Sequence, residues 1–444
     1  MSGAADSLFD PAPFGPHNDD VPPPDASDEG GTPRLRTPER RQLVISTRCL
    51  DDLLPPEHEA RLIWRYVGTL DLRPLLARIQ AVPGGCGRNA TDPRILIALW
   101  LYATVEGIGS ARQLARLCAS HDAFRWIAGG VSLNHHTLSD FRVRHEAFLD
   151  ELLTRSVAAL MHQGLVDLNR VTQDGVRVRA SAGSKTFRRR PALTNCLSEA
   201  RQQVQKLKQE RQDPQDDSDQ PPARRERSLE ERERRLTQSL EELERLEAHR
   251  RKHQKPARCS TTDPEARIMK MACGGFRPAY NVQFATDQAS GMVVGVDAVN
   301  TGSDKGQLGP MYDQLERRYG RVPREYVADG DFQSAEDIDR MSERGTAVYV
   351  PLLEWESWDL APGDPGPRDT AAMTDVRRRM ASERGQQIYR TRASTSEWVN
   401  AQCRNRGLQQ FLVRGLGKVR CIAYWHALTH NVLRMIGLGI LQPG

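Results

Sequence analysis

Three carboxylates in this sequence stand in contexts that could hold metal ions. Asp174 lies in VTQDGVRVRA (171–180), Asp329 in YVADGDF (326–332) and Glu397 in YRTRASTSEWVNAQCRNRG (389–407). Without His or Cys partners, such a set favours Mg²⁺ or Mn²⁺, hard ions that take oxygen ligands. Two such ions about 4 Å apart can activate a water or a 3′-hydroxyl and stabilise the leaving oxygen of an in-line phosphodiester substitution.

Two of these acids precede a glycine in stretches that otherwise resemble β-strands. Val171, Val176 and Val178 alternate with polar neighbours, although Asp and Gly are poor strand residues. The Asp-Gly pair is therefore either a plain turn or an acid that a rigid sheet holds for chemistry. Asp331 is the main rival to Asp329 as a ligand, and Asp304 in NTGSDKGQ is expected to begin a helix.

The third acid has a competing explanation, because Ser394 to Glu397 reads as a capping box at a helix start. On that helix Glu397 and Arg404 are seven residues apart and share a face, with Tyr389 and Arg392 just ahead. One surface would thus gather an acid, two guanidinium groups and a phenol. Such a surface suits phosphate groups.

The elements that must position these acids follow from the hydrophobic period. The expected order is strand 171–180, an insertion, strands 279–287 and 292–300, helix 307–318, strand 324–332, helix 334–343 and strand 346–352. This order matches a ribonuclease-H-like mixed sheet, a mixed α/β (α+β) fold whose first three strands are antiparallel. Asp174 and Asp329 would then lie on neighbouring strands, at one edge of the sheet.

Residues from about 50 to 165 have a helical pattern. TDPRILIALWLYATVEG begins with a cap residue and a proline in the first turn, and three short helices are expected at Ser110, at His121 and near His136. These short helices carry Arg112, Arg116, Arg125, Arg142 and Arg144. They suit a helix-turn-helix-like DNA-binding element, and a plain helical bundle explains them equally well.

Residues 188–256 interrupt the expected sheet. Leucine and other apolar residues repeat at spacings of three and four amid Arg and Glu, and DPQDDSDQPP between the two runs cannot continue a helix. The pattern predicts two helices folded back as an antiparallel coiled-coil hairpin. Arg188 and Arg189, at its base, could contact backbone phosphates or simply be solvated.

The charge distribution favours a polyanionic partner. Residues 1–31 carry six Asp and one Glu without Lys or Arg, so the rest of the chain has a net charge of about +12. Residues 1–40 have the composition of a disordered tail. The eight cysteines form no C-x-x-C pair and no signal peptide precedes them, which indicates a reducing cytoplasm. The apolar stretch 422–441 contains His426, His430, Asn431 and Arg434, so it reads as a buried helix and not as a membrane span.

Taken together, these motifs resemble bacterial insertion-sequence transposases of the DDE type, in the group with a Tyr, Arg, Glu, Lys signature. DPRILIALWLYATVEGIGSARQLARLC and HHTLSDFRVRH resemble the N-terminal helical domain of that group, VTQDGVRVRASAG its first-acid strand, YVADGDF its second, and the segment from YRTRASTSEW onward its third-acid helix and tail. The resemblance spans about residues 45–440. One departure is that Arg404 replaces the usual lysine, which keeps the charge but changes its geometry.

The resemblance implies roles and partners. Asp174, Asp329 and Glu397 would be the metal ligands for Mg²⁺, with Mn²⁺ as a substitute, and Tyr389, Arg392 and Arg404 would contact DNA. The implied activity is cleavage at the element's terminal inverted repeats and strand transfer into target DNA, by a homodimer at the bacterial nucleoid. A nuclease without strand transfer and an inactive DNA-binding remnant are the alternatives. The implied parts are a tail (1–40), a helical DNA-binding domain (41–165), a catalytic domain (166–187 and 257–442) and the hairpin insertion (188–256).

Overall fold

The computed structural model describes residues 47–81, 89–210, 222–249, 256–352, 361 and 363–442. The expected disordered tail, residues 1–40, and the linker segment DPQDDSDQPP up to Pro221 lie outside this range. No helix in the described ranges has the length and apolar character needed to cross a membrane.

The first part of the chain is helical, as the sequence predicts. It comprises a 3₁₀ turn (Leu50–Leu53), α1 (Glu59–Gly68), α2 (Arg73–Leu76), α3 (Pro93–Val105), α4 (Ala111–Ser120), α5 (Asp122–Ala128), α6 (His135–Arg144) and α7 (Glu146–His162). Asp92 caps α3 by accepting a hydrogen bond from the Arg94 amide at 2.8 Å, and Pro93 is its first residue. The predicted starts of α4 and α5 are confirmed, since Ser110 and His121 precede them.

The sheet has the predicted strand directions. Its strands are β1 (Arg170–Arg179), β4 (Arg267–Lys270), β5 (Phe276–Asp287), β6 (Val293–Val299), β7 (Glu325–Val327) and β8 (Ala347–Tyr349). The order along the sheet is β5, β1, β7, β8, and both β4 and β6 pair with the free edge of the long strand β5. β1 is antiparallel to β5 and parallel to β7. The prediction that the strands of Asp174 and Asp329 are neighbours is confirmed.

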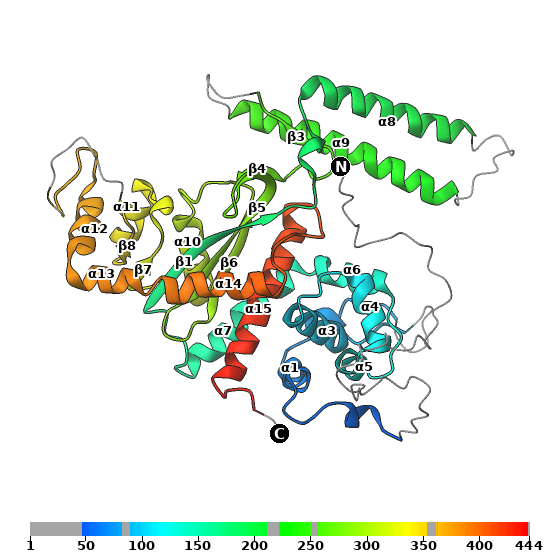
Figure 1. The fold of residues 1–444 in the computed structure, drawn as a ribbon, viewed down its shortest axis with the longest axis horizontal. Coiled ribbons are helices and arrows are strands. Elements are labelled where there is room, and N and C mark those ends of the chain that lie inside the picture. The colour runs from blue at the N-terminus through cyan, green and yellow to red at the C-terminus, as the bar shows by residue number, and fades with distance from the viewer. Residues whose placement is uncertain are drawn as a thin grey trace, which may run out of the picture. The chain divides into compact units, whose positions relative to one another are not determined.

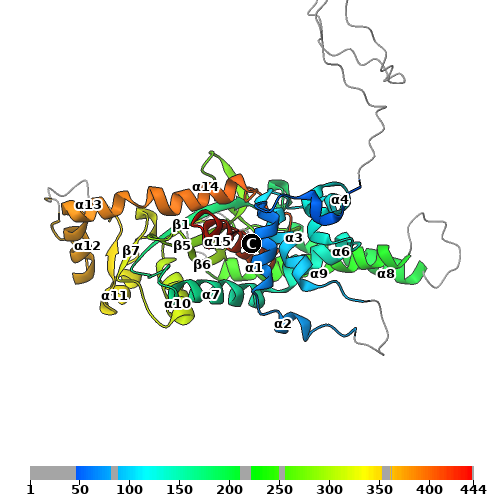
Figure 2. The same ribbon diagram turned by 90° about the horizontal axis from the view of Figure 1, so that it is seen from below.

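Helices cover both faces of this sheet (Figures 1 and 2). They are α10 (Leu308–Tyr319), α11 (Ala335–Glu343), α12 (Ala371–Ala381), α13 (Glu383–Arg390), α14 (Trp398–Asn405) and α15 (Leu416–Gly437). Figure 2 shows α13 and α14 in line above the sheet, with α10 and α11 below it. The apolar C-terminal segment forms α15, which Asn431 joins to β6 through both Val293 backbone groups at 2.8 Å.

The predicted insertion is an antiparallel helical hairpin of α8 (Arg190–Glu210) and α9 (Pro222–Ala248), seen side by side in Figure 1. Its start pairs with its end, because Arg190 bonds Glu247 at 2.7 Å. A separate apolar cluster holds the two helices together; it contains Leu193, Leu197, Ala200, Leu236 and Leu243. Two short strands, β2 (Phe187–Arg188) and β3 (Cys259–Ser260), close the base of the hairpin.

Candidate active site

The first acid lies inside an uninterrupted strand. Asp174 pairs with Phe284 of β5 and the next residue, Gly175, with Gln283, so the Asp-Gly pair makes no turn. One carboxylate oxygen of Asp174 accepts a hydrogen bond from the Gly175 amide at 2.9 Å, and the other accepts from Asn400 Nδ2 at 3.0 Å. Burial raises the pKa of this carboxyl to about 6.

The glycine is required by the opposite face of β1. A Cβ at Gly175 would lie 2.5 Å from Asp304 Oδ1 and 2.6 Å from Gln283 Nε2. Asp304 is buried there and accepts hydrogen bonds from Asn281 and Gln283 at 2.6 and 2.7 Å. The expectation that Asp304 begins a helix is therefore wrong, since α10 begins at Leu308 and Asp304 instead packs beneath the first acid.

The second acid follows a strand parallel to the first. Asp329 comes two residues after β7 and caps a 3₁₀ turn (Gly330–Phe332), and its Oδ1 accepts from the Gly330 amide at 2.6 Å. Here the predicted turn is present. Asp331, the rival candidate, is exposed within that turn. Asp329 is the acid whose charge acts on Asp174 and whose Oδ2 lies 3.7 Å from the Arg392 guanidinium.

The third acid lies in a π-helical turn, Ala393–Glu397, that continues the path of α13 into α14. The capping-box explanation is wrong, because the turn has no side-chain cap and the Ser394 hydroxyl donates to the Thr391 carbonyl at 2.9 Å. π turns add one residue to a helical turn and occur often at functional sites. The π turn that carries Glu397 thus begins at Ala393, after a two-residue turn at Thr391 and Arg392 that follows α13.

The Arg392 guanidinium lies among all three acids. Its nitrogens are 3.8 Å from Asp174 Oδ2, 3.7 Å from Asp329 Oδ2 and 2.8 Å from Glu397 Oε1. The Tyr389 ring centre lies 5.6 Å from the guanidinium carbon. The side chains of Asp174 and Arg392 are mostly buried, at 18% and 14% exposed, but those of Asp329 and Glu397 are about half exposed. The site therefore opens to solvent on the side of the last two acids.

The three carboxylates have the chemistry to bind a divalent cation, although the Arg392 guanidinium now lies between them. Three carboxylates from separate elements converge on one positive group, and carboxylate oxygen is the ligand that hard ions prefer. Among the described residues no group of three Asp, Glu, His or Cys side chains is close enough to share a metal ion as it stands. The guanidinium would have to withdraw for the three acids to share one.

The other arginines of interest lie elsewhere. Arg404 is exposed on α14, and within the described ranges its side chain forms no hydrogen bond or ion pair. Arg188 and Arg189 are exposed at the base of the hairpin, and Arg144 is exposed with its guanidinium bonded to Asp140 at 2.8 Å.

Arg142 does not fit its expected role in DNA contact. Its side chain is buried, stacks 4.6 Å from the Trp100 ring centre and donates to the Gly109 carbonyl. Burial lowers its pKa to about 10. The guanidinium thus serves the interior of the helical region, which argues against a contact with DNA.

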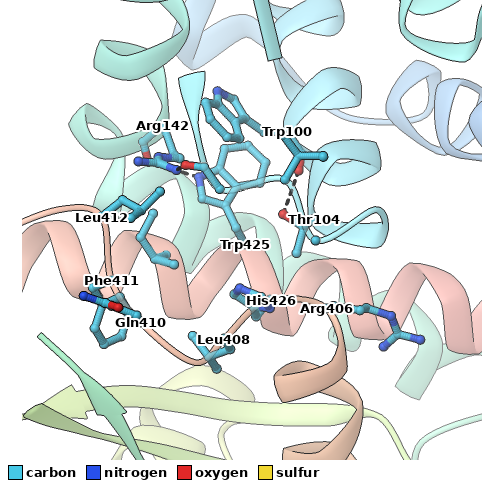
Figure 3. A pocket seen from close by; sticks show the side chains of 15 residues that line it. Trp100, Thr104, Arg142, Arg406, Leu408, Gln410, Phe411, Leu412, Trp425 and His426 are labelled. Carbon is cyan, nitrogen blue, oxygen red and sulfur yellow. Dashed lines mark hydrogen bonds between the residues drawn. The ribbon is translucent and has the colours of Figure 1, made fainter. Parts of the chain in front are cut away.

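Arg142 also lines a pocket between the helical region and the segment after α14 (Figure 3). Arg142 and Arg406 lie on opposite sides of His426 in this pocket, and burial lowers the His426 pKa to about 3. The lining includes none of Asp174, Asp329, Glu397 and Arg392. The pocket therefore lies where the helical region packs against the segment after α14, and it is not part of the acidic site.

Two candidate functional residues were not identified from the sequence. Asn400, which donates to Asp174, is three residues after Glu397, so helical spacing alone could have placed it beside the acids. Asp304 had no such signal, because its burial depends on glycine and amides from other strands.

Two family models match this chain. A transposase domain (DUF772) matches residues 48–144, and a transposase DDE domain matches residues 367–436. The second match includes Tyr389, Arg392 and Glu397, whereas Asp174 and Asp329 lie outside both. No curated protein and no solved structure matches the chain.

The helical region is similar to one transposase domain and the acid-bearing helix to another, and these two matches support an insertion-sequence transposase of the DDE type. Transposases bind DNA, and those of the DDE type generally use divalent metal ions.

Proposed function

We propose that this transposase binds the terminal inverted repeats of its insertion sequence, hydrolyses the phosphodiester at each end and joins the freed 3′-hydroxyl to target DNA. The observation that carries the proposal is the convergence of Asp174, Asp329 and Glu397 on Arg392. These acids come from a strand, a strand end and a helix that are far apart in the sequence. A set of negative charges assembled in this way is expensive to maintain without a function.

The fold supports a ribonuclease-H-like catalytic domain. Strands β6, β5, β1, β7 and β8 follow the spatial order 3-2-1-4-5, with antiparallel pairing among the first three and parallel pairing in the last two. We assign residues 166–187 and 257–442 to this domain, 41–165 to a helical DNA-binding domain and 188–256 to the hairpin insertion.

In the proposed mechanism, Asp174, Asp329 and Glu397 would hold Mg²⁺, with Mn²⁺ as a substitute. Ions bound there would supply charge stabilisation and activation of a water or hydroxyl for in-line substitution. Asp174 is held by a backbone amide and by Asn400, so both of its oxygens keep fixed directions. Arg392, once it withdraws from the acids, and Tyr389 beside it would contact the phosphate next to the cleaved bond.

Binding outside the acidic site is proposed to involve duplex backbone. Arg404, Arg188, Arg189 and Arg144 are exposed and suit phosphate contacts. Concerted joining of two ends requires two active sites, so we propose a homodimer that acts on the nucleoid in the bacterial cytoplasm.

The test is cleavage and joining of labelled duplex carrying the element's own ends, with Mg²⁺ present. The parent is compared with Asp174→Asn, Asp329→Asn and Glu397→Gln, and Asp331→Asn serves as a matched control. We expect the first three variants to shift the duplex in a gel but neither cut nor join it. The control is expected to do all three.

Other outcomes would change the proposal in defined ways. Cutting without joining by the parent would make the protein a nuclease. Binding without cutting would make it a DNA-binding remnant, and loss of activity in Asp331→Asn with normal Asp329→Asn would move the second ligand to Asp331.

A further inference from the structure

Asn400 links the third-acid helix to the first-acid strand. It lies on α14, 6% exposed, and its Nδ2 donates to Asp174 Oδ2 at 3.0 Å across 226 positions of sequence. An ionised carboxylate only accepts hydrogen bonds, so the amide nitrogen is the end that must face Asp174. The direction of the Asn400 side chain is thereby fixed.

The oxygen end of the same amide differs from the nitrogen end. Asn400 Oδ1 is buried and has no hydrogen-bond partner in the described part of the chain. A buried acceptor without a partner costs about 1–3 kcal/mol. A helix that needed only a link to the sheet would be better served by an apolar residue at this position.

A second buried asparagine shows the contrast. Asn431 on α15 uses both ends of its amide, since Nδ2 donates to the Val293 carbonyl and Oδ1 accepts from the Val293 amide, each at 2.8 Å. Asn431 therefore ties a helix to an outer strand. Asn400 is instead satisfied only where it touches an acid of the active site.

We propose that Asn400 is a positioning residue for the metal site: it orients the Asp174 carboxylate and keeps an amide oxygen free for a water or ligand at that site. Glu397 lies one helical turn before Asn400, so the same turn of helix carries the third acid and the group that orients the first. The inference rests on the proposed function, because it assumes that Asp174 binds metal.

The test is the Mn²⁺ affinity of the full chain without DNA, measured from the electron paramagnetic resonance signal of free Mn²⁺. Asn400→Leu keeps the approximate volume but removes the donor. Loss of a residue that orients a metal ligand typically weakens metal binding about 10- to 100-fold, and that range is expected here. The melting temperature without metal is expected to stay near that of the parent, because the unpaired oxygen is removed as well.

Control variants separate positioning from a purely structural role. Asn431→Leu is expected to lower the melting temperature and leave Mn²⁺ affinity unchanged. Cys403→Ala, at a buried neighbour on α14, is expected to lower the melting temperature less and also to leave Mn²⁺ affinity unchanged. If Asn400→Leu does not fold, Asn400→Ala removes the same donor with less volume. Excess Mn²⁺ is expected to restore the cleavage rate of either Asn400 variant.

Two results would overturn the inference. Parent-like Mn²⁺ affinity in a folded Asn400 variant would show that Asn400 is structural, and the proposed function would still stand. A parent that neither binds Mn²⁺ nor cuts DNA would remove the proposed function together with this inference.

Discussion

Arg392 donates to Glu397 at 2.8 Å although the two residues are five positions apart. In a regular α-helix, with 3.6 residues per turn, such residues lie about 140° apart around the axis. The π-helical turn Ala393–Glu397 takes up the additional residue and returns Glu397 to the face of Arg392. One inserted residue is therefore part of how the site is assembled.

Removal of Ser394, which is exposed in that turn, tests this explanation. The deletion leaves Arg392 and Glu397 four apart, a spacing that an ordinary α-helix also brings onto one face. We expect Mn²⁺ affinity close to that of the parent and a higher melting temperature. Deletion of Ala401 from regular α14 is the matched control and is expected to destabilise the fold, since it turns Cys403 out of the core. Weak Mn²⁺ binding after Ser394 deletion would show that the π geometry itself is required.

Arg392→Gln is expected to strengthen metal binding in the absence of DNA. The guanidinium now neutralises the three acids, so a divalent ion must displace it. Hydrogen bonds to charged groups contribute about 1.5–3 kcal/mol, so Mn²⁺ affinity is expected to rise roughly tenfold. DNA affinity should fall. Arg404→Gln is the control, and it should leave Mn²⁺ affinity unchanged because the Arg404 side chain is away from the acids. Weaker Mn²⁺ binding by Arg392→Gln would instead mean that Arg392 supports the metal site.

The raised pKa of Asp174 predicts a pH dependence of stability. Burial lifts this pKa from 3.8 to about 6, so the folded protein binds more protons than the unfolded chain between these values. Ionisation of Asp174 thus lowers the free energy of unfolding of the metal-free protein above pH 6. Asp174→Asn is expected to melt at a higher temperature than the parent at pH 7, and the difference should disappear as the pH falls toward 4.

Metal binding should show the same group with the opposite trend. A proton on Asp174 competes with Mn²⁺, so the affinity of the parent is expected to fall as the pH drops below about 6. Titrations of Mn²⁺ at several pH values would measure this. A constant affinity from pH 7 to pH 5 would remove Asp174 from the ligand set.

The sequence predicted the features that depend on the local hydrophobic period. It did not predict the features that depend on contacts between residues far apart in the sequence. Alternation and turn residues located the strands of Asp174 and Asp329, and strand order made them neighbours. The π turn was missed because a single inserted residue leaves the capping pattern of Ser394 intact. The burial of Arg142 depends on the Trp100 ring, which lies 42 positions earlier and on another helix.

Gly175 offers the clearest test of how the fold supports the first acid. Alanine at this position would place its Cβ within 3 Å of Asp304, Gln283 and Asn281, a network that is buried on the face opposite Asp174. Overpacking of this kind typically costs about 1–3 kcal/mol in the free energy of unfolding, and Gly175→Ala is expected to fall in this range. Chemical denaturation of the metal-free protein would measure this cost.

Gly183→Ala is the matched control, since its Cβ would meet only the Thr186 methyl at 4.0 Å and its backbone is extended. Mn²⁺ affinity should fall in Gly175→Ala alone, because the displaced network shifts β1 at the residue that precedes the glycine. Equal stability of the two variants would show that Asp304 and its amide partners move aside freely, and that the glycine serves the strand for another reason.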